Sequence, residues 1–401
     1  MRALQWIVAA GTAAVLAACG GGGGGGGGGS TDGTLRVALT DAPSCGYDHV
    51  FVTVEKVRVH QSSGAADADA GWSEVVVSPP RKIDLRTLEN GVLEELGSTP
   101  LPQGQYSQIR LVLASNTGTG TSSLANSVQP TGGTLTALST PSAQQSGLKL
   151  QAHFDVAAGQ TTDVLLDFDA CKSVVKAGNS GQYILKPVVS VVPRAVSGIQ
   201  GYVTTTLSLS STTVAAQQNG VTVRSTVPDS AGKFNIPFLP VGTYTLVIAS
   251  DGHATGVITG VPASTATTVV SSTATAITTP ASAMANVTGT VSVTTVSGSG
   301  TVSTALTDAT VRALQTLTGG PTIELGNQAV DAMLGTYVFR LPVGAPVKAA
   351  FVPGGPLSFV ADAAVAGKYT IQVQSPGRAN LEKPADIGSG TSTTVNFAYG
   401  P

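Results

Sequence analysis

Short runs of alternating apolar and polar residues recur along the chain after position 33. In the clearest run, 50–60, Val50, Val52 and Val54 share one face while the residues between them fall on the other. Alternation with a period of two predicts strands with one buried face. Weaker runs predict further strands over 34–40, 74–77, 105–114, 148–156, 161–168 and 183–192. Many short strands between Gly, Ser and Thr loops predict an all-β fold built of sandwiches.

One segment of the first half follows a different period. Leu85, Leu88, Val92 and Leu96 are spaced three or four residues apart, as on one face of a helix. Gly97 follows at a point where a helix can end. The pattern predicts one amphipathic helix over 85–96.

A turn pattern divides the chain into three tandem β-sandwich domains. Leu, Pro, any residue and Gly recur in that order, and a proline in the second position with a glycine in the fourth favours a type I turn. The three copies begin at Leu101, Leu239 and Leu341. Convergent turn chemistry is the alternative explanation for matches this short. Boundaries are predicted at Pro193-Arg194-Ala195 and at the Thr-, Ala- and Ser-rich stretch with Pro280, because such stretches are poor core formers and act as linkers. The predicted domains are therefore 34–194, 195–272 and 287–401, with a linker over 273–286 and an insertion near 346–366 in the last domain.

Composition limits the classes of partner. Of all residues 42% are hydrophobic, which is enough for packed cores, and only 11% are charged, with a net charge of −2. This balance argues against nucleic acid, because phosphate contacts need clustered Lys and Arg. Residues 34–194 carry 12 basic and 14 acidic residues, against 8 and 8 in 195–401. The N-terminal domain is therefore the better candidate for binding a polar ligand or an ion.

The first residues predict export and anchoring. Arg2 precedes an apolar run over 3–15 that is too short to span a bilayer core of about 30 Å. The run ends in Leu16-Ala17-Ala18-Cys19, which resembles the lipobox of bacterial lipoproteins. The resemblance implies a signal peptide over 1–18, lipid (including palmitate) on Cys19, and a place in the bacterial cell envelope, with the outer membrane favoured. An ordinary signal peptide followed by a chance cysteine is the alternative.

A glycine run follows the predicted anchor. Ten glycines, Gly20 to Gly29, lie in the segment 19–33. A flexible chain of this length reaches roughly 15–20 Å, enough to clear lipid headgroups. The run is therefore predicted to be a tether, and a low-complexity tract without a selected length is the alternative.

The N-terminal domain resembles the bacterial family called domain of unknown function 4382. The residues that carry the resemblance are Leu39-Thr40-Asp41-Ala42-Pro43, Tyr47-Asp48-His49-Val50, Val54-Glu55-Lys56-Val57, Asn90-Gly91-Val92-Leu93 and Gln108-Ile109-Arg110-Leu111. The resemblance implies an architecture and a lipoprotein context, and it implies no activity.

The two later domains resemble the carboxypeptidase-regulatory-like, transthyretin-like sandwich. The first copy carries Gly201-Tyr202-Val203, Gly232-Lys233-Phe234 and Leu239-Pro240-Val241-Gly242-Thr243-Tyr244, and the second, more divergent copy begins at Gly289-Thr290-Val291. This module is non-catalytic in carboxypeptidases and resembles carbohydrate-binding-like folds. The resemblance therefore implies binding or structural roles, with glycans as a candidate ligand.

The remaining cysteines predict a disulfide. With Cys19 lipidated, Cys45 and Cys171 are left in the N-terminal domain of an exported chain, where disulfides persist. Their bond would close a long loop, worth roughly 4–5 kcal/mol in the chain-entropy model. Two buried free thiols are the alternative, and the absence of a Cys/His motif argues against zinc.

Four carboxylates near these cysteines suggest calcium. Asp41, Asp48, Asp167 and Asp169, together with His49, would gather at one end of the sandwich if Cys45 and Cys171 were bonded. Calcium takes 6–8 oxygen ligands, which such a group begins to supply. The alternative is that Asp41 and Asp48 cap turns around Pro43 and Gly46.

Catalytic motifs are absent from the sequence. The four histidines and the many serines form no nucleophile elbow, HExxH helix or dinucleotide-binding loop. We therefore expect a non-enzymatic, lipid-anchored envelope protein that acts as a binding, adhesion or structural module. A carbohydrate-binding lipoprotein, with Trp72 as the stacking residue, and a calcium-stabilised scaffold are the alternatives. Trp72 could equally be a core residue, and an enzyme is a third class.

Expected partners are the membrane, through the lipid anchor, and glycans or another envelope protein. No cofactor other than calcium is expected, and no nucleic acid.

Overall fold

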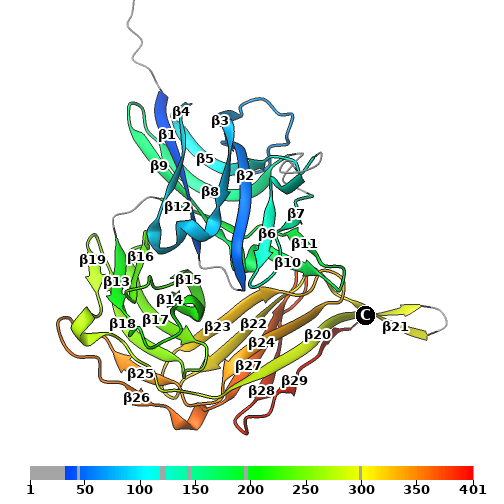
Figure 1. Ribbon diagram of the computed structural model, residues 1–401. Helices are drawn as coiled ribbons and strands as arrows, with labels where there is room; N and C mark the ends of the chain where they lie inside the picture. Colours follow the sequence, from blue (N-terminus) through cyan, green and yellow to red (C-terminus); the bar gives the residue numbers. More distant parts are fainter. Residues whose placement is uncertain are drawn as a thin grey trace, which may run out of the picture.

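The computed structural model describes residues 32–42, 46–117, 123–141, 146–193, 197–297 and 300–400. Within these ranges the chain is almost entirely strands, arranged as packed sheets (Figure 1), which confirms the all-β class. None of the helices described is long and apolar enough to cross a membrane. The predicted signal peptide, Cys19, the glycine tether and Cys45 lie outside the described residues.

Two sheets form the N-terminal domain. The smaller has the order β12-β9-β1-β4, and the larger has the order β10-β11-β7-β6-β2-β5-β8 with β3 paired to β2. The strands of the smaller sheet are β1 (Asp32–Ala42), β4 (Glu94–Pro102), β9 (Thr161–Asp169) and β12 (Val189–Pro193). The strands of the larger sheet are β2 (Tyr47–His60), β3 (Ser73–Asp84), β5 (Gly104–Leu113), β6 (Ser127–Pro130), β7 (Thr136–Ser139), β8 (Leu148–Val156), β10 (Val174–Ala177) and β11 (Gln182–Leu185).

The alternating valines of β2 are part of the core between these sheets. Val50, Val52 and Val54 are fully buried and belong to one apolar cluster with residues of the smaller sheet such as Leu35 and Phe168. The period of two in the sequence thus positions one face of each strand inward.

The expected helix over 85–96 is wrong beyond its first turns. A 3-10 helix, η1, covers Leu85–Gly91, and Leu85 and Leu88 are buried as the pattern predicted. Asn90 takes a positive φ of 60°, which ends the helix, and β4 begins at Glu94. Leu96 is buried from that strand instead. Pairing of β4 with β1 therefore overrides the local helical period.

The second and third domains repeat one topology. In each, the first strand pairs antiparallel with a hairpin strand and parallel with the last strand, and a four-strand sheet covers it. The second domain contains β13 (Gly198–Tyr202), β14 (Thr212–Gln218), β15 (Val221–Thr226), β16 (Lys233–Pro237), β17 (Gly242–Ser250), β18 (Gly256–Ala263) and β19 (Thr267–Val269). The third contains β20 (Met284–Ser297), β21 (Gly300–Ala305), β22 (Thr310–Thr316), β23 (Thr322–Ala329), β24 (Thr336–Pro342), β27 (Lys368–Gln374), β28 (Leu381–Asp386), β29 (Thr393–Thr394) and β30 (Phe397–Tyr399).

The repeated turn has the same hydrogen bond in all three domains. In the N-terminal domain the hydroxyl of Tyr106 donates to the carbonyl oxygen of Pro102 over 3.1 Å. The equivalent bonds run from Tyr244 to Pro240 at 2.7 Å and from Tyr369 to Pro342 at 2.5 Å. Tyr369 reaches its proline although an inserted segment separates the two in sequence. The third domain therefore contains the same turn, with a segment inserted between the proline and the tyrosine.

That insertion joins the sheet of the second domain. Its strand β25 (Val347–Ala350) pairs parallel with β18, and β26 (Val360–Ala361) pairs with β25, which extends the sheet to six strands (Figure 1). The amide of Val347 donates to the carbonyl of Thr255, and that of Phe351 donates to Thr259, both over 2.8 Å. The inserted segment therefore ties the third domain to the second.

The segment 273–286, which we predicted to be a linker, lies against the second domain. Ile277 is buried, its amide donates to the carbonyl of Tyr202, and its own carbonyl accepts from the amide of Thr204. The last residues of the segment, from Met284, already belong to β20. Backbone hydrogen bonds hold these small polar residues against the second domain, and composition alone does not record such bonds.

Buried contacts link the domains. Between the second and third, Val247, Val257, Leu317 and Ile323 form an apolar cluster. The N-terminal domain meets both of the others through hydrogen bonds and one buried ion pair. The contacts are Asn90 with Thr226 and with Asn235, Asp167 with Arg224, Gly178 with Asp331, and Lys186 with Thr307.

Candidate functional sites at the Trp72 loop and the domain junction

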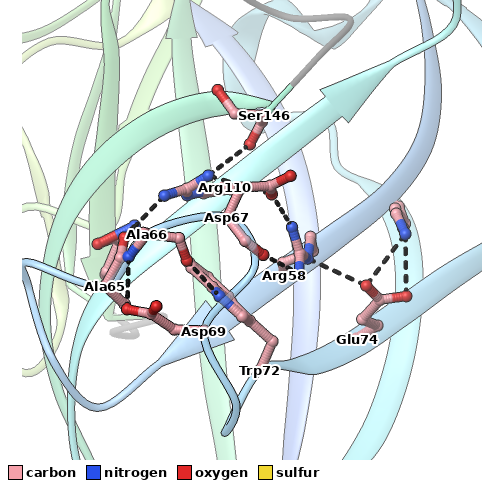
Figure 2. A network of polar contacts seen from close by, with 11 residues as sticks. Arg58, Ala65, Ala66, Asp67, Asp69, Trp72, Glu74, Arg110 and Ser146 are labelled. Atoms are coloured by element: carbon pink, nitrogen blue, oxygen red, sulfur yellow. Dashed lines mark hydrogen bonds and ion pairs between the residues drawn. The ribbon is translucent and has the colours of Figure 1, made fainter.

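Trp72 lies at the end of the loop 61–72 between β2 and β3. Its indole ring makes contacts with this loop and with the sheet. The side chain is half-buried, and its indole N–H donates to the carbonyl of Ala66 over 2.9 Å. The guanidinium groups of Arg58 and Arg110 lie over the ring, 4.6 and 4.7 Å from its centroid (Figure 2). Cation–π contact of this kind stabilises the loop on the sheet.

Ion pairs complete the Trp72 network. Asp67 forms ion pairs with Arg58 and with Arg110, the latter at 3.3 Å (Figure 2). Glu74 forms ion pairs with Arg58 and with Lys56, each at 3.0 Å. Arg110 also donates to the carbonyl of Ala65 over 2.8 Å. A sugar that stacked on Trp72 would have to displace an arginine from the face that it covers. The assignment of Trp72 to ligand binding stays a prediction, while its contacts describe a residue that holds the loop.

Three of the four predicted carboxylates come together. Asp41, Asp167 and Asp169 lie at the ends of the parallel strands β1 and β9, where Ala42 is opposite Asp169. Asp48 lies apart from them and accepts the amide of Gly132 over 3.2 Å.

Asp41 is a buried carboxylate with one oxygen unused. Only 3% of the residue is exposed, and its Oδ1 accepts the amide of Ala170 over 3.1 Å. Its Oδ2 has no hydrogen-bond partner among the residues that the structure describes. Burial raises the pKa of the Asp41 carboxyl well above its usual range, and the nearby charge of Asp169 raises it further. A buried carboxylate without a cation favours its protonated form.

The other two carboxylates are paired with cations. Asp167 lies 3.1 Å from Arg224 of the second domain, in an ion pair that is almost fully buried on both sides. Burial raises the pKa of the Asp167 carboxyl, and Arg224 opposes that shift. Asp169 caps the short helix α1 (Ala170–Ser173) by accepting the amide of Lys172, and it pairs with the ammonium of Lys172 at 2.8 Å.

Calcium binding stays a prediction. Over the described ranges, no three His, Cys, Asp or Glu side chains form a group that could hold a metal ion. His49, which we expected beside the carboxylates, instead pairs with Asp84 at 2.6 Å and stacks on Phe51. The observed contacts fit turn capping for Asp48, and domain joining for Asp167.

Cys171 lies in α1 and is disulfide-bonded. Cys45 is outside the described residues, so its pairing with Cys171 stays a prediction.

The other histidines are held by backbone carbonyls or lie on the surface. A ring nitrogen of His60 lies 3.0 Å from the carbonyl of Ala70, and one of His253 lies 2.9 Å from that of Thr279. His153 is exposed on β8. That the protein is not an enzyme stays a prediction.

Two cavities lined by described residues lie at the junctions between domains, and the sequence analysis did not predict either of them. One has a volume of about 260 Å³ and is lined by all three domains, and the other has about 740 Å³ and lies between the first and the third. Cys171, Gly326 and Asn327 line both. The walls come from residues more than a hundred positions apart, so no local motif could indicate these cavities.

Comparison with known proteins identifies the first domain only. Residues 32–187 match the family model "Domain of unknown function (DUF4382)", which confirms the resemblance for that part of the chain. No curated protein matches the chain.

Two solved structures that match are crystal structures of a type II cohesin–X-dockerin complex from Acetivibrio cellulolyticus, an N-terminal and a C-terminal interface mutant. Each match has 29% identity over 22% of this chain and 59% of the other, with TM-scores of 0.19 and 0.18. A likeness this limited gives no functional conclusion.

Proposed function

We propose that this protein is a non-enzymatic, lipid-anchored protein of the bacterial envelope that presents three joined sandwiches as a binding or structural module. The observation that carries the proposal is the joining itself. A buried ion pair, a shared sheet and an apolar cluster connect domains that the sequence shows only as a tandem array. Stiff presentation of a surface at the end of a tether needs such connections, because independent domains on linkers would move relative to one another.

The lipobox-like sequence before Cys19 and the glycine run after it support anchoring in the outer membrane. Growth of the producing bacterium with an alkyne analogue of palmitate tests this part. We expect label on the wild-type protein in the outer-membrane fraction and no label on Cys19→Ser. Cys45→Ser is the matched control and should stay labelled. Label that persists in Cys19→Ser would refute lipidation at this residue.

We also propose that Cys45 is the disulfide partner of Cys171, which is the pairing that remains if Cys19 carries lipid. Peptide mapping without reduction should yield one linked pair that contains both cysteines, and reduction should separate it. Recovery of Cys45 as a free thiol in the folded protein would rule out the pairing.

A further inference from the structure

We propose that the larger cavity, between the N-terminal and third domains, binds a neutral, hydroxyl-rich ligand of the size of a short oligosaccharide. This inference rests on the binding role proposed above and names its site and ligand class. The volume of about 740 Å³ lies within the range of small-molecule sites, which commonly form between domains. One wall comes from Tyr47 and β10 of the N-terminal domain, and the other from β20, β23, β24 and β29 of the third.

The walls of this cleft offer neutral hydrogen-bonding groups. Hydroxyl and amide side chains can each donate and accept, which matches the alternating donors and acceptors of a sugar. The neutral polar residues of the lining are Thr288, Thr290, Asn327, Gln328, Thr336, Thr394 and Asn396. Thr288, Thr290, Gln328, Thr394 and Asn396 also make hydrogen bonds within the third domain, so they offer a ligand only their remaining donors and acceptors. Three aromatic residues, Tyr47, Tyr337 and Phe339, supply apolar surface beside them.

The charged groups of the cleft argue against an ionic ligand. Asp331 already accepts the amides of Gly178, Met333 and Leu334, at 2.8 to 3.0 Å, so its carboxylate is used within the protein. Among the described residues of the lining, Lys176 is the one basic residue. A single exposed lysine is a weak basis for anion binding, whereas the remaining polar groups are uncharged.

Asn327 marks where a ligand would bind. Its Oδ1 is buried and has no hydrogen-bond partner among the described residues, and its Nδ2 makes a long bond of 3.3 Å to Glu324. A buried acceptor without a donor destabilises the folded protein, and a hydroxyl of a bound ligand would supply the missing donor. Asn327 also lines the smaller cavity, where the hydroxyl of Thr255, a residue only 1% exposed, is likewise without a partner among the described residues. Of the residues that the structure describes, Asn327 is the one with an unpartnered acceptor that lines the larger cavity, and it also lines the smaller one.

The test uses the purified full chain and three neutral probes, maltotetraose, cellotetraose and chitotetraose, followed by isothermal titration and saturation-transfer NMR. Asn327→Ala removes the unpartnered acceptor, and Thr394→Trp places a bulky group at an exposed position of the lining. Thr301→Trp is the matched control, because Thr301 is exposed on β21 and does not line the cleft. Melting curves of all variants establish that each is folded.

We expect at least one probe to bind the wild type and the Thr301→Trp control equally. Loss of one hydrogen bond corresponds to a weakening of about tenfold in Asn327→Ala, and Thr394→Trp should weaken binding at least as much. Binding that survives both cleft variants would place the sugar elsewhere and overturn the site while leaving the proposed binding role intact. Absence of binding by all three probes at millimolar concentration would overturn the ligand class. Neither result bears on the lipid anchor, which the palmitate experiment tests separately.

Discussion

At the scale of single residues, two neighbouring buried aspartates should respond in opposite ways to the same substitution. Asp41 pairs with no cation among the described residues, whereas Asp167 pairs with Arg224. The difference matters because a buried carboxylate is costly when unpaired, and removal of one partner from a buried pair leaves the other uncompensated.

Asp41→Asn should stabilise the protein at neutral pH. The folded-state pKa of Asp41 lies above its unfolded value, so its contribution to stability is complete below the unfolded pKa, near 3.9, and is lost as the pH rises through the folded pKa. Asparagine keeps the acceptor for the amide of Ala170 and carries no charge. We expect a gain of about 1–3 kcal/mol at pH 8 and a flatter dependence of melting temperature on pH between 4 and 8. An unchanged pH slope would contradict the prediction.

Asp167→Asn should destabilise the protein, because Arg224 would remain buried without its counter-charge. The expected loss is about 3–5 kcal/mol at pH 7, measured by denaturant unfolding beside Asp41→Asn under the same conditions. Equal effects of the two variants would show that the ion pair does not distinguish them.

These residues also show the limit of sequence reasoning at this scale. The sequence grouped Asp41, Asp48, His49, Asp167 and Asp169 through a predicted Cys45–Cys171 bond. Of these, Asp41, Asp167 and Asp169 lie together because their strands end at one edge of the sheet, whereas Asp48 and His49 have other partners. The pairing of Asp167 with Arg224 could not be predicted, because Arg224 belongs to another domain. For Trp72, the sequence could not predict that two arginines of neighbouring strands cover the ring.

At the scale of elements, the insertion in the third domain carries a clear function in packing. Its presence could be predicted from the sequence, because the strand expected after the Leu-Pro-Val-Gly turn comes about twenty residues late. The sheet that it joins could not be predicted, because the parallel pairing of β25 with β18 depends on how two domains pack against each other. Likewise the helical period of 85–96 is local, and the pairing of β4 that overrides it is not.

Ala349→Glu should detach β25 from the second domain. Ala349 is 2% exposed and lies opposite Ile258, so a carboxylate there would be buried without a partner. We expect faster cleavage within 346–366 in limited proteolysis, together with a lower melting temperature. Ala350→Glu is the control, because its side chain is exposed on the same strand and should leave the cleavage pattern of the wild type. Similar cleavage of both variants would mean that burial at β25 does not hold the segment.

At the scale of the whole molecule, the links between domains predict cooperative unfolding. Asn90 of the N-terminal domain accepts hydrogen bonds from the hydroxyl of Thr226 and the amide of Asn235. Asp331 of the third domain accepts one from the amide of Gly178. Domains that share such contacts stabilise one another, so each loses support when its neighbour unfolds. We expect one calorimetric transition for the wild type.

The double variant Asn90→Gly, Asp331→Ala should divide that transition. Glycine keeps the positive φ of position 90 and removes only the amide group, so the change acts on the contact between domains and not on the fold of η1. The Asp167–Arg224 pair and the Lys186–Thr307 bond remain, but with fewer links the N-terminal domain should melt separately and at lower temperature. Arg340→Ala is the control: its pair with Asp251 also crosses a domain boundary, but both side chains are about half exposed, and pairs of that kind contribute little. Two transitions in the wild type would show that at least one sandwich unfolds independently of the others. If that sandwich is the N-terminal one, a rigid cleft between the first and third domains would lose its physical basis.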